Sequence, residues 1–446
     1  SSHLVDVEAI DGVVTLEGSV GTILAEDRAV KLASTVKGVR SIVNQLEVSP
    51  GARSDSEIRQ DVIKALALDP ATESYELDVS VKGATVALSG TVQSWAERKL
   101  AEKVAKSVKG VKGVENDVTI SYKEPRNDEE IRAEIQRRME LNPLVGDGLV
   151  DITVDDGVVS LSGTVGSLAE KNEARFAAYV LGVDKVESED LKVEPWLSSE
   201  MRRKSSVVIK SDRALEKAVN DALLFDPRTL SFKLDVEADA GVVTLRGVVD
   251  NLRSKRAAER DAANTVGVSQ VVNLIKVRNE QPVTNRELTE DVQKVLRWDP
   301  YLERYEITPV VRNREVHLYG TVDNYYERAR AADVVATVDG VAEVTNMLDV
   351  EYNWTWQSDA TIKSEINDEL FWSWRISEED LDVSVDGGEA RLTGKLDSWR
   401  EMYAAVNNAF EGGAKFVEVD ATIEGSGEVS AEYAVPVYYE TYYWYD

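Results

Sequence analysis

The stretch Asp11-Gly-Val-Val-Thr-Leu-Glu-Gly-Ser-Val20 decides the fold, because close variants of it return five times along the chain. The variants occupy residues 83–92, 156–165, 240–249, 313–322 and 387–396. The glycines at their eighth position, Gly18, Gly90, Gly163, Gly247, Gly320 and Gly394, are separated by 72, 73, 84, 73 and 74 residues. Self-similarity at a nearly fixed period indicates one folding unit used repeatedly. The sequence therefore predicts a tandem array of six units.

One complete unit lies between residues 54 and 122. Its start carries the capping-box pair Ser54 and Glu57, followed by an apolar stripe at helical spacing. Alternating apolar residues on both sides of a glycine turn then predict a β-hairpin. The predicted elements are a helix at 54–69, strands at 75–81 and 85–92, a second helix at about 94–108, and a third strand at 114–122. The unit therefore has the order α-β-β-α-β, which belongs to the α+β class.

The same order recurs along the chain with three departures. The predicted units cover residues 1–49, 54–122, 127–195, 211–278, 284–352 and 358–424. The first unit has no opening helix, so the open face of its sheet must be covered by something else: either the helix was lost to processing or a partner supplies it. An insert at 196–210 separates the third and fourth units, and a tail at 425–446 follows the last unit. Units of about 70 residues are marginally stable alone, so neighbouring units are expected to pack on one another.

Composition limits the functions that this chain can have. Its 446 residues include 81 acidic and 52 basic side chains, which give a net charge of −29. Such a charge repels phosphate backbones, so no nucleic acid partner is expected, and it disfavours simple electrostatic adhesion to an anionic membrane. The absence of Cys excludes disulfides and thiolate metal sites. No apolar run is long enough to predict a transmembrane segment, and the start at Ser1 leaves open what precedes it.

Three motifs recur together in these units. They are a helix ending in Leu-x-x-Asp-Pro, a hairpin strand reading Gly-Val-Val-Thr-Leu-x-Gly-x-Val, and a Gly-Val followed by Val-x-Asn after the second helix. Examples are Leu66 to Pro70, Leu223 to Pro227, Leu296 to Pro300, Gly38-Val39 with Val43-Asn44, Gly267-Val268 with Val272-Asn273, and Gly340-Val341 with Val344-Thr345-Asn346.

These units resemble the BON-domain family, named for bacterial osmotic-shock and nodulation proteins. The resemblance implies a small three-stranded mixed sheet with two helices on one face. It also implies an exported, periplasmic or cell-surface bacterial location and a non-enzymatic role. Family members are commonly described as binding phospholipid or other envelope components. The chain differs from the usual family member by its six copies and by the incomplete first one.

Catalytic chemistry has little support in the sequence. With only His3 and His317, no Cys and no nucleophile elbow, neither a nucleophilic triad nor a histidine metal site is expected. No cofactor is predicted. Calcium is the one metal considered, because Asp155-Asp156-Gly157 and Asp386-Gly387-Gly388-Glu389 place carboxylates at hairpin turns. The alternative is that Asp-Gly is simply favourable turn chemistry.

Two segments outside the units are candidate contact sites. The insert carries Arg202, Arg203 and Lys204, which could touch lipid headgroups or an acidic partner. The tail is rich in aromatic residues and lacks Lys and Arg, a composition typical of interface anchors. The predicted interface residues are Tyr433, Val435, Val437, Tyr438, Tyr439, Tyr442, Tyr443, Trp444 and Tyr445. Alternatively, this tail folds back onto the fifth or sixth unit.

The sequence thus favours a structural or interaction protein whose main partner is a second copy of itself. An uncovered first unit and an aromatic tail are different surfaces, so joining them is a heterologous contact that propagates into a filament unless it closes a ring. The alternative hypothesis is a periplasmic envelope-stress protein that binds phospholipid.

Overall fold

The computed structural model describes most of the chain. The described residues are 5–69, 72, 75–121, 126–142, 145, 149–194, 211–230, 232–268, 270–278, 283–351, 357–373, 376, 381–396, 399–423, 427–434 and 436–437. Arg202, Arg203 and Lys204 of the insert lie outside these residues. So do Val435, Tyr438, Tyr439, Tyr442, Tyr443, Trp444 and Tyr445 of the tail.

The second repeat shows how the unit is built. The Ser54 hydroxyl accepts from the backbone of Glu57, whose carboxylate accepts from Ser54, so the predicted capping box is present at the start of the first helix. The elements are α2 (Asp55–Leu68), β4 (Leu77–Lys82), β5 (Thr85–Val92), α3 (Trp95–Lys106) and β6 (Gly113–Ile120). Strand β5 is central; it pairs antiparallel with β4 and parallel with β6. The predicted α-β-β-α-β order is confirmed.

The other repeats follow this plan with small changes. The first consists of β1 (Val5–Ile10), β2 (Val13–Val20), α1 (Ile23–Ser34) and β3 (Ser41–Val48). The third consists of α4 (Asp128–Leu141), β7 (Val150–Asp155), β8 (Val158–Val165), α5 (Leu168–Ala177), β9 (Lys185–Glu187) and β10 (Leu191–Val193). The fourth consists of α7 (Asp212–Phe225), β11 (Leu234–Asp239), β12 (Val242–Val249), α8 (Leu252–Ala263), β13 (Gln270–Asn273) and β14 (Lys276–Val277). In these last two repeats the third strand is divided into two pieces.

The fifth repeat is again regular. It consists of α9 (Asn285–Trp298), β15 (Thr308–Arg312), β16 (Glu315–Val322), α10 (Tyr325–Ala336) and β17 (Glu343–Val350). The sixth consists of α11 (Asp359–Trp372), β18 (Leu381–Asp386), β19 (Glu389–Leu396), α12 (Trp399–Glu411) and β20 (Phe416–Ile423), with a fourth strand β21 (Gly427–Tyr433) that pairs antiparallel with β20. The sheets are mixed and have three or four strands.

The repeating glycine is required by the hairpin. Gly90 has φ +136°, and a Cβ built on it would lie 2.6 Å from the carbonyl oxygen of Glu76, the residue just before strand β4. At the equivalent Gly163, a Cβ would lie 2.1 Å from the carbonyl oxygen of Leu149. Real side chains do not fit at such distances, so the glycine allows the first strand to approach the second closely.

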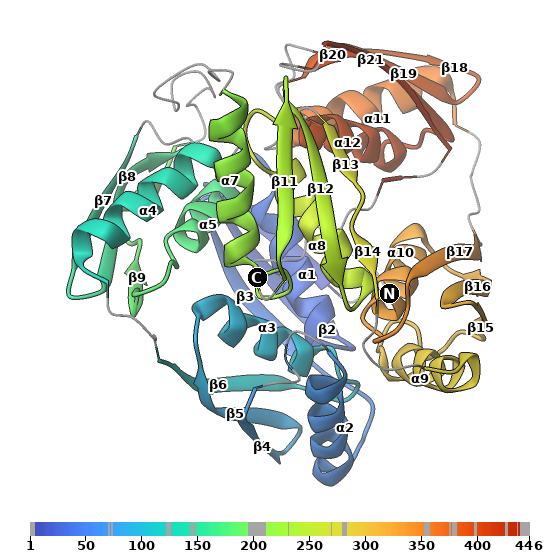
Figure 1. Ribbon diagram of the computed structural model, residues 1–446. Helices are drawn as coiled ribbons and strands as arrows, with labels where there is room; N and C mark the ends of the chain where they lie inside the picture. Colours follow the sequence, from blue (N-terminus) through green and yellow to red (C-terminus); the bar gives the residue numbers. More distant parts are fainter. Residues whose placement is uncertain are drawn as a thin grey trace.

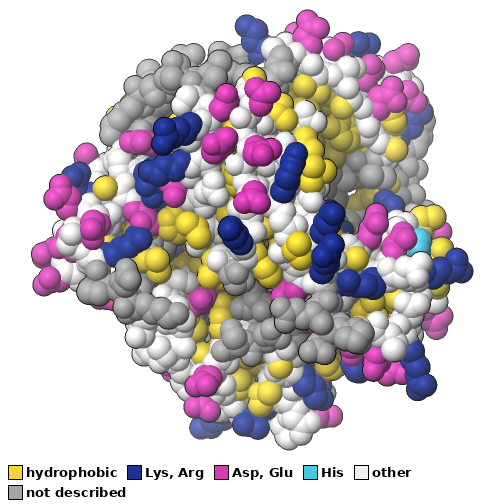
Figure 2. All heavy atoms as spheres, in the orientation of Figure 1, with side chains coloured by type: hydrophobic (Ala, Val, Ile, Leu, Met, Phe, Trp, Pro, Cys, Tyr) yellow, Lys and Arg dark blue, Asp and Glu magenta, His cyan; other side chains and the backbone are white. Residues whose placement is uncertain are grey.

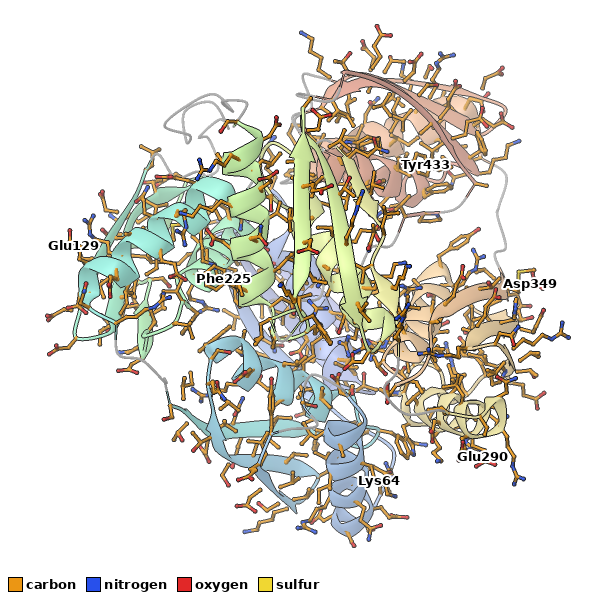
Figure 3. The ribbon with its side chains drawn as sticks, viewed as in Figure 1. Lys64, Glu129, Phe225, Glu290, Asp349 and Tyr433 are labelled. Carbon is orange, nitrogen blue, oxygen red and sulfur yellow. The ribbon has the colours of Figure 1, made fainter. Side chains whose placement is uncertain are left out.

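Each repeat has its own apolar core between the sheet and the helices. The second helices α1, α3, α5, α8, α10 and α12 lie toward the middle of the molecule, while the sheets of the second, third, fifth and sixth repeats lie at the periphery (Figure 1). Phe225 is near the middle, whereas Lys64, Glu129 and Glu290 are at the edges (Figure 3). The array therefore folds back on itself and is not an extended solenoid.

Contacts join repeats that are distant in sequence as well as neighbours. The first repeat contacts the second through Lys106 Nζ, 2.9 Å from the Asp27 carboxylate. It contacts the fifth through Arg28, whose guanidinium lies 3.8 Å from the centre of the Tyr326 ring. Arg253 of the fourth repeat donates to Asp69 of the second at 2.7 Å. The expected packing of neighbouring units is therefore extended by contacts between non-neighbours.

Candidate functional site

The first repeat exposes apolar side chains whose counterparts in the second repeat are buried. Val7, in the middle of β1, is 65% exposed, whereas Val79 at the same register of β4 is 6% exposed. Leu32 and Val36, near the end of α1, are 53% and 41% exposed. Their counterparts in the second repeat, Val104 and Val108, are buried. We call Val7, Leu32 and Val36 the open face.

An opening helix covers this position in each of the other five repeats. Every such helix buries three aliphatic or Met side chains spaced four residues apart, so one stripe of the helix faces the sheet. The triplets are Ile58, Val62 and Leu66 in α2, Ile131, Ile135 and Met139 in α4, Leu215, Val219 and Leu223 in α7, Leu288, Val292 and Leu296 in α9, and Ile362, Ile366 and Leu370 in α11. The described residues of the first repeat begin at Val5, the first residue of β1.

The sixth repeat meets the first at the edge of the open face. The backbone N–H of Lys37 donates to the carbonyl oxygen of Trp372 at 2.8 Å, and Val36 forms an isolated antiparallel bridge with Ser373. Phe371 lies under the ammonium of Lys37, 5.3 Å from the ring centre to Nζ. Phe371 and Trp372 are themselves substantially exposed. Apolar surface from both ends of the array is therefore gathered in one place.

The described start of the tail packs on its own repeat. Val429 and Tyr433 lie against the core of the sixth repeat, as does Val437. The side-chain amide of Asn407 donates to the carbonyl oxygen of Val437 and accepts from its N–H, at 2.9 and 2.8 Å. Of the predicted interface residues, Tyr433 and Val437 thus follow the fold-back alternative.

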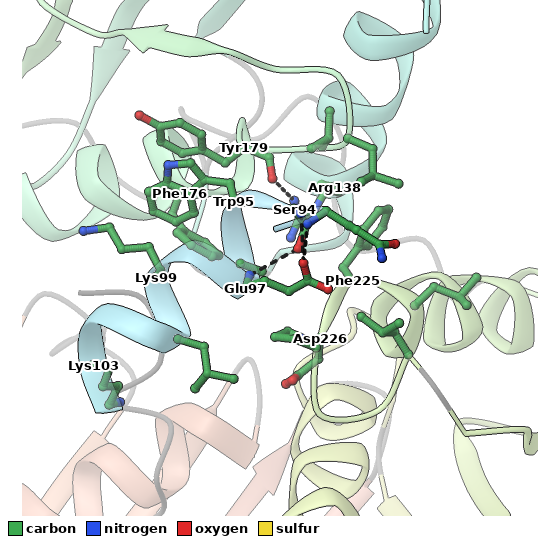
Figure 4. Close-up of a pocket in the computed structure, with 18 residues that line it drawn as sticks. Ser94, Trp95, Glu97, Lys99, Lys103, Arg138, Phe176, Tyr179, Phe225 and Asp226 are labelled. Carbon is green, nitrogen blue, oxygen red and sulfur yellow. Dashed lines mark hydrogen bonds between the residues drawn. The ribbon is translucent and has the colours of Figure 1, made fainter. Parts of the chain in front are cut away.

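A small cavity lies where the second, third and fourth repeats meet. Trp95 stacks on Tyr179, with ring centres 3.9 Å apart, and Arg138 lies 4.5 Å from the centre of the Phe225 ring (Figure 4). The cavity has a volume of about 180 Å³. Sites for drug-sized ligands are typically about 300–1,000 Å³, so this space is better explained as a junction between repeats.

Sequence reasoning missed the residues that form such junctions, although one signal was present. The first position of every second helix is an apolar or aromatic residue. In four repeats this residue packs on a different repeat: Ile23 on the second, Trp95 on the third, Leu168 on the first and Leu252 on the fifth. A large apolar residue directly after a helix N-cap therefore marks contacts between repeats in this chain.

The recurring Asp-Pro motif supplies buried carboxylates, and these pair with arginines. Asp226 lies between Arg228 and Arg260, and Asp299 contacts Arg330 at 2.8 Å. Burial opposes the charged form of Asp226, but the two guanidinium groups outweigh it and lower the pKa of that carboxyl. Burial and the nearby Asp226 charge raise the pKa of Asp261 well above its usual range. Each Asp of the Asp-Pro motif therefore links the C-terminal end of an opening helix to the second helix of a repeat.

The metal and catalytic candidates have ordinary structural roles. Asp156 and Gly157 form a two-residue hairpin turn with left-handed φ angles, and both N–H groups donate to Asp128. His317 lies in strand β16, 3.4 Å from Glu315. Within the part of the chain that the structure describes, no group of three or more His, Cys, Asp or Glu side chains is arranged to hold a metal ion. None of the described helices is both long and apolar enough to cross a bilayer.

The family model described as BON domain matches residues 2–50, 54–122, 127–195, 211–279, 284–352 and 358–424. The chain belongs to the BON-domain family. It contains six tandem BON domains, and a stretch of 121 residues is 35% identical to osmotically-inducible protein Y of Escherichia coli strain K12. That match covers 26% of this chain and 60% of the relative.

Solved structures that resemble this BON-repeat chain come from CdsD, a structural protein of the type III secretion system of Chlamydia trachomatis. One of these structures is 13% identical in sequence to this chain, with a TM-score of 0.14. The match covers 50% of this chain and 94% of the solved chain. A structure of the C-terminal domain of CdsD is 14% identical in sequence to this chain, with a TM-score of 0.14. The match covers 48% of this chain and 98% of the solved chain.

Proposed function

We propose that this BON-repeat protein is a non-enzymatic structural or interaction protein of the bacterial cell envelope or exterior, and that its copies associate through the open face. The observation that carries the proposal is the exposure of Val7, Leu32 and Val36, at positions whose counterparts in the second repeat are buried. Burying an aliphatic side chain contributes about 1.5–3 kcal/mol, so this face gains by being covered.

A head-to-tail arrangement is the proposed geometry. The open face belongs to the first repeat and the aromatic tail to the end of the chain, so a contact between them in two copies would be heterologous and could build a filament. Within one copy, Tyr433 and Val437 are used by the sixth repeat. We therefore propose that residues beyond Val437 make the contact with a second copy.

The envelope setting is part of the same proposal. It is supported by family membership and by a relative whose name describes induction by osmotic change. Phospholipid binding is the alternative function. The net charge of −29 disfavours electrostatic adhesion to anionic lipid, and acidic and basic side chains are interspersed on the face in Figure 2.

Sedimentation velocity and electron microscopy of the purified chain test self-association. We expect concentration-dependent assembly that is lost in Val7→Asp and on deletion of residues 438–446. Val43→Asp is the matched control, because Val43 is also exposed and lies in β3 of the same sheet, where the second repeat has the exposed Glu115. A chain that stays monomeric at high concentration, or assembles equally well as Val7→Asp, contradicts the proposal. Flotation of the chain with anionic liposomes would favour the lipid alternative.

A further inference from the structure

The outer edge of the third strand is closed by a side chain in the second repeat. Strand β6 has one edge against β5, and Ser121, directly after β6, donates its N–H to the carbonyl oxygen of Val92. Successive N–H groups along a strand point to opposite edges, so the N–H of Val118 points to the outer edge. It donates to Oδ1 of Asn116 at 3.3 Å. An N–H that a further strand would use is therefore already bonded.

The same bond recurs in three other repeats. In each of them an Asn accepts from the backbone N–H two residues later. The pairs are Asn44 with Leu46 at 3.1 Å, Asn273 with Ile275 at 3.1 Å, and Asn346 with Leu348 at 3.2 Å. The third repeat achieves the same result with a backbone turn, because the N–H of Leu191 donates to the carbonyl oxygen of Ser188 at 3.2 Å. In five repeats this N–H is thus bonded within the repeat.

The Asn side chain also joins the strand edge to the second helix. The amide group of Asn116 donates to the carbonyl oxygen of Arg98 in α3 at 3.0 Å. The amide groups of Asn273 and Asn346 donate to carbonyl oxygens of α8 and α10 in the same way. Because the amide is held at its nitrogen, its oxygen is kept beside the edge N–H. This gives the recurring Asn after the second helix a physical role.

The sixth repeat has Val419 at the position of this Asn. Val419 is buried and occupies the register position of Asn116, opposite a leucine of the central strand. A valine side chain has no acceptor for the N–H of Ala421, the residue two positions later. Ala421 is paired instead with Val429 of β21. Strand β21 therefore adds to an edge that no Asn closes.

Packing and charge complete the sixth sheet once β21 has added. Val429 and Tyr433 lie against the core of the sixth repeat. Glu428 and Glu432 of β21 are exposed. Charged side chains on an edge strand disfavour the addition of another strand. The new edge is thus protected by charge, whereas the edges of four other repeats are protected by Asn.

We propose that one residue of the third strand determines whether the sheet edge of a repeat accepts a further strand: Asn closes the edge, and Val419 opens it to β21. This inference goes beyond the proposed function, since it concerns the sheet edges and not the open face. Unpaired strand edges promote pairing between sheets. The Asn residues therefore also keep the sheets of different repeats, and of different copies, from pairing with one another.

Hydrogen exchange of the β21 amides tests the open edge. In Val419→Asn, we expect the new side chain to bond the N–H of Ala421 and displace β21. The amides of Val429 and Ala431 should then exchange at least about tenfold faster than in the unmodified chain. Val419→Ala is the control, because it removes the valine methyl groups without supplying an acceptor, and its β21 should stay protected. Amides of α11 report whether the sixth repeat remains folded.

The converse test opens a closed edge. The probe is a fluorescent peptide with the sequence of residues 427–434, titrated into the full chain and followed by anisotropy. We expect saturable binding to Asn116→Val and none to the unmodified chain. Asn116→Asp is the matched control, because its carboxylate still accepts from Val118 but cannot donate to Arg98. The peptide should not bind this control, whereas a role limited to holding α3 would make the two substitutions equivalent.

The outcomes decide the inference in both directions. It is overturned by equal exchange of β21 in Val419→Asn and Val419→Ala. It is also overturned by a peptide that binds the unmodified chain, fails to bind Asn116→Val, or binds Asn116→Asp equally well. If Val419→Asn unfolds the sixth repeat, exchange in α11 rises together with that in β21, and the Asn116 variants decide. Circular dichroism checks that these variants are folded.

Discussion

At the scale of single residues, a few side chains hold distant repeats together. Arg253 of α8 and Asp69 of the second repeat form an almost completely buried pair, although 184 positions separate the two residues in the sequence. Removing one partner from a buried pair leaves an uncompensated charge, which costs more than the pair itself contributes. The contact is therefore a sensitive point for the packing of the second repeat on the fourth.

Arg253→Ala is expected to lower the free energy of local opening at the end of α2 by about 3 kcal/mol. Native-state hydrogen exchange of amides in α2 and α8 measures this change. Arg286→Ala is the matched control, because Arg286 pairs with Glu290 on the surface and its side chain is 88% exposed. The control should change opening in its own helix by less than about 0.5 kcal/mol. Equal effects of the two substitutions would contradict the role given to Arg253.

At the scale of elements, the regular features of the sequence were sufficient to predict the secondary structure. Helical and strand periodicities recur in six copies, so the helices, the hairpins and their order could be predicted, and the capping box at Ser54 is present as expected. The repeating glycine could be recognised as a register mark. Its physical reason, the close approach of the Glu76 carbonyl to Gly90, becomes visible only in the folded hairpin.

Gly90→Ala is expected to destabilise the second repeat by about 3 kcal/mol, because the new Cβ meets the Glu76 carbonyl and Ala is strained at φ +136°. Hydrogen exchange in β4 and β5 localises the loss to that repeat. Gly21→Ala serves as the control, since no atom lies within 4 Å of a Cβ built there and its φ lies outside the left-handed region. We expect the control to change stability by less than about 0.5 kcal/mol. A Gly90→Ala protein with unchanged exchange in β4 and β5 would show that the hairpin can relax around the methyl group.

The candidate site could be predicted only in part. The missing opening helix of the first repeat predicted an uncovered face, and Val7 is exposed there. Residues 427–433 extend the sixth sheet as β21, in line with the alternative that the tail folds back onto the fifth or sixth unit. Strand addition to a free sheet edge satisfies backbone groups without a recognisable side-chain motif, so composition alone did not reveal it. The contact of the tail with another copy and that of Arg202, Arg203 and Lys204 with lipid or an acidic partner stay predictions.

At the scale of the whole molecule, the six repeats are compactly arranged. The sequence predicted packing between neighbours, but it could not show which distant repeats meet. That choice depends on single side chains such as Arg28 and Arg253, which follow no period. The stability of each repeat is therefore linked to several others, in contrast to a solenoid in which each repeat contacts only its neighbours.

Small-angle X-ray scattering tests this arrangement. A compact chain of this length should have a radius of gyration of about 22 Å when the data are extrapolated to zero concentration. Trp95→Ala removes the stack on Tyr179 and should loosen the contact between the second and third repeats, so the radius should increase. Glu129→Ala, exposed at the periphery, is the control and should leave the radius unchanged. A value well above 22 Å for the unmodified chain would indicate six units strung out with little contact.

The contact between Lys37 and Trp372 also has a consequence for the order of events during translation. The two residues are about 335 positions apart, and a ribosome adds about 5–20 residues per second. The first repeat to leave the ribosome must therefore wait roughly 20–70 s for the last one to reach it. During that interval its apolar surface is available to chaperones and to other nascent chains. The yield of correctly assembled protein should therefore depend on how well the N-terminal repeat is protected during translation.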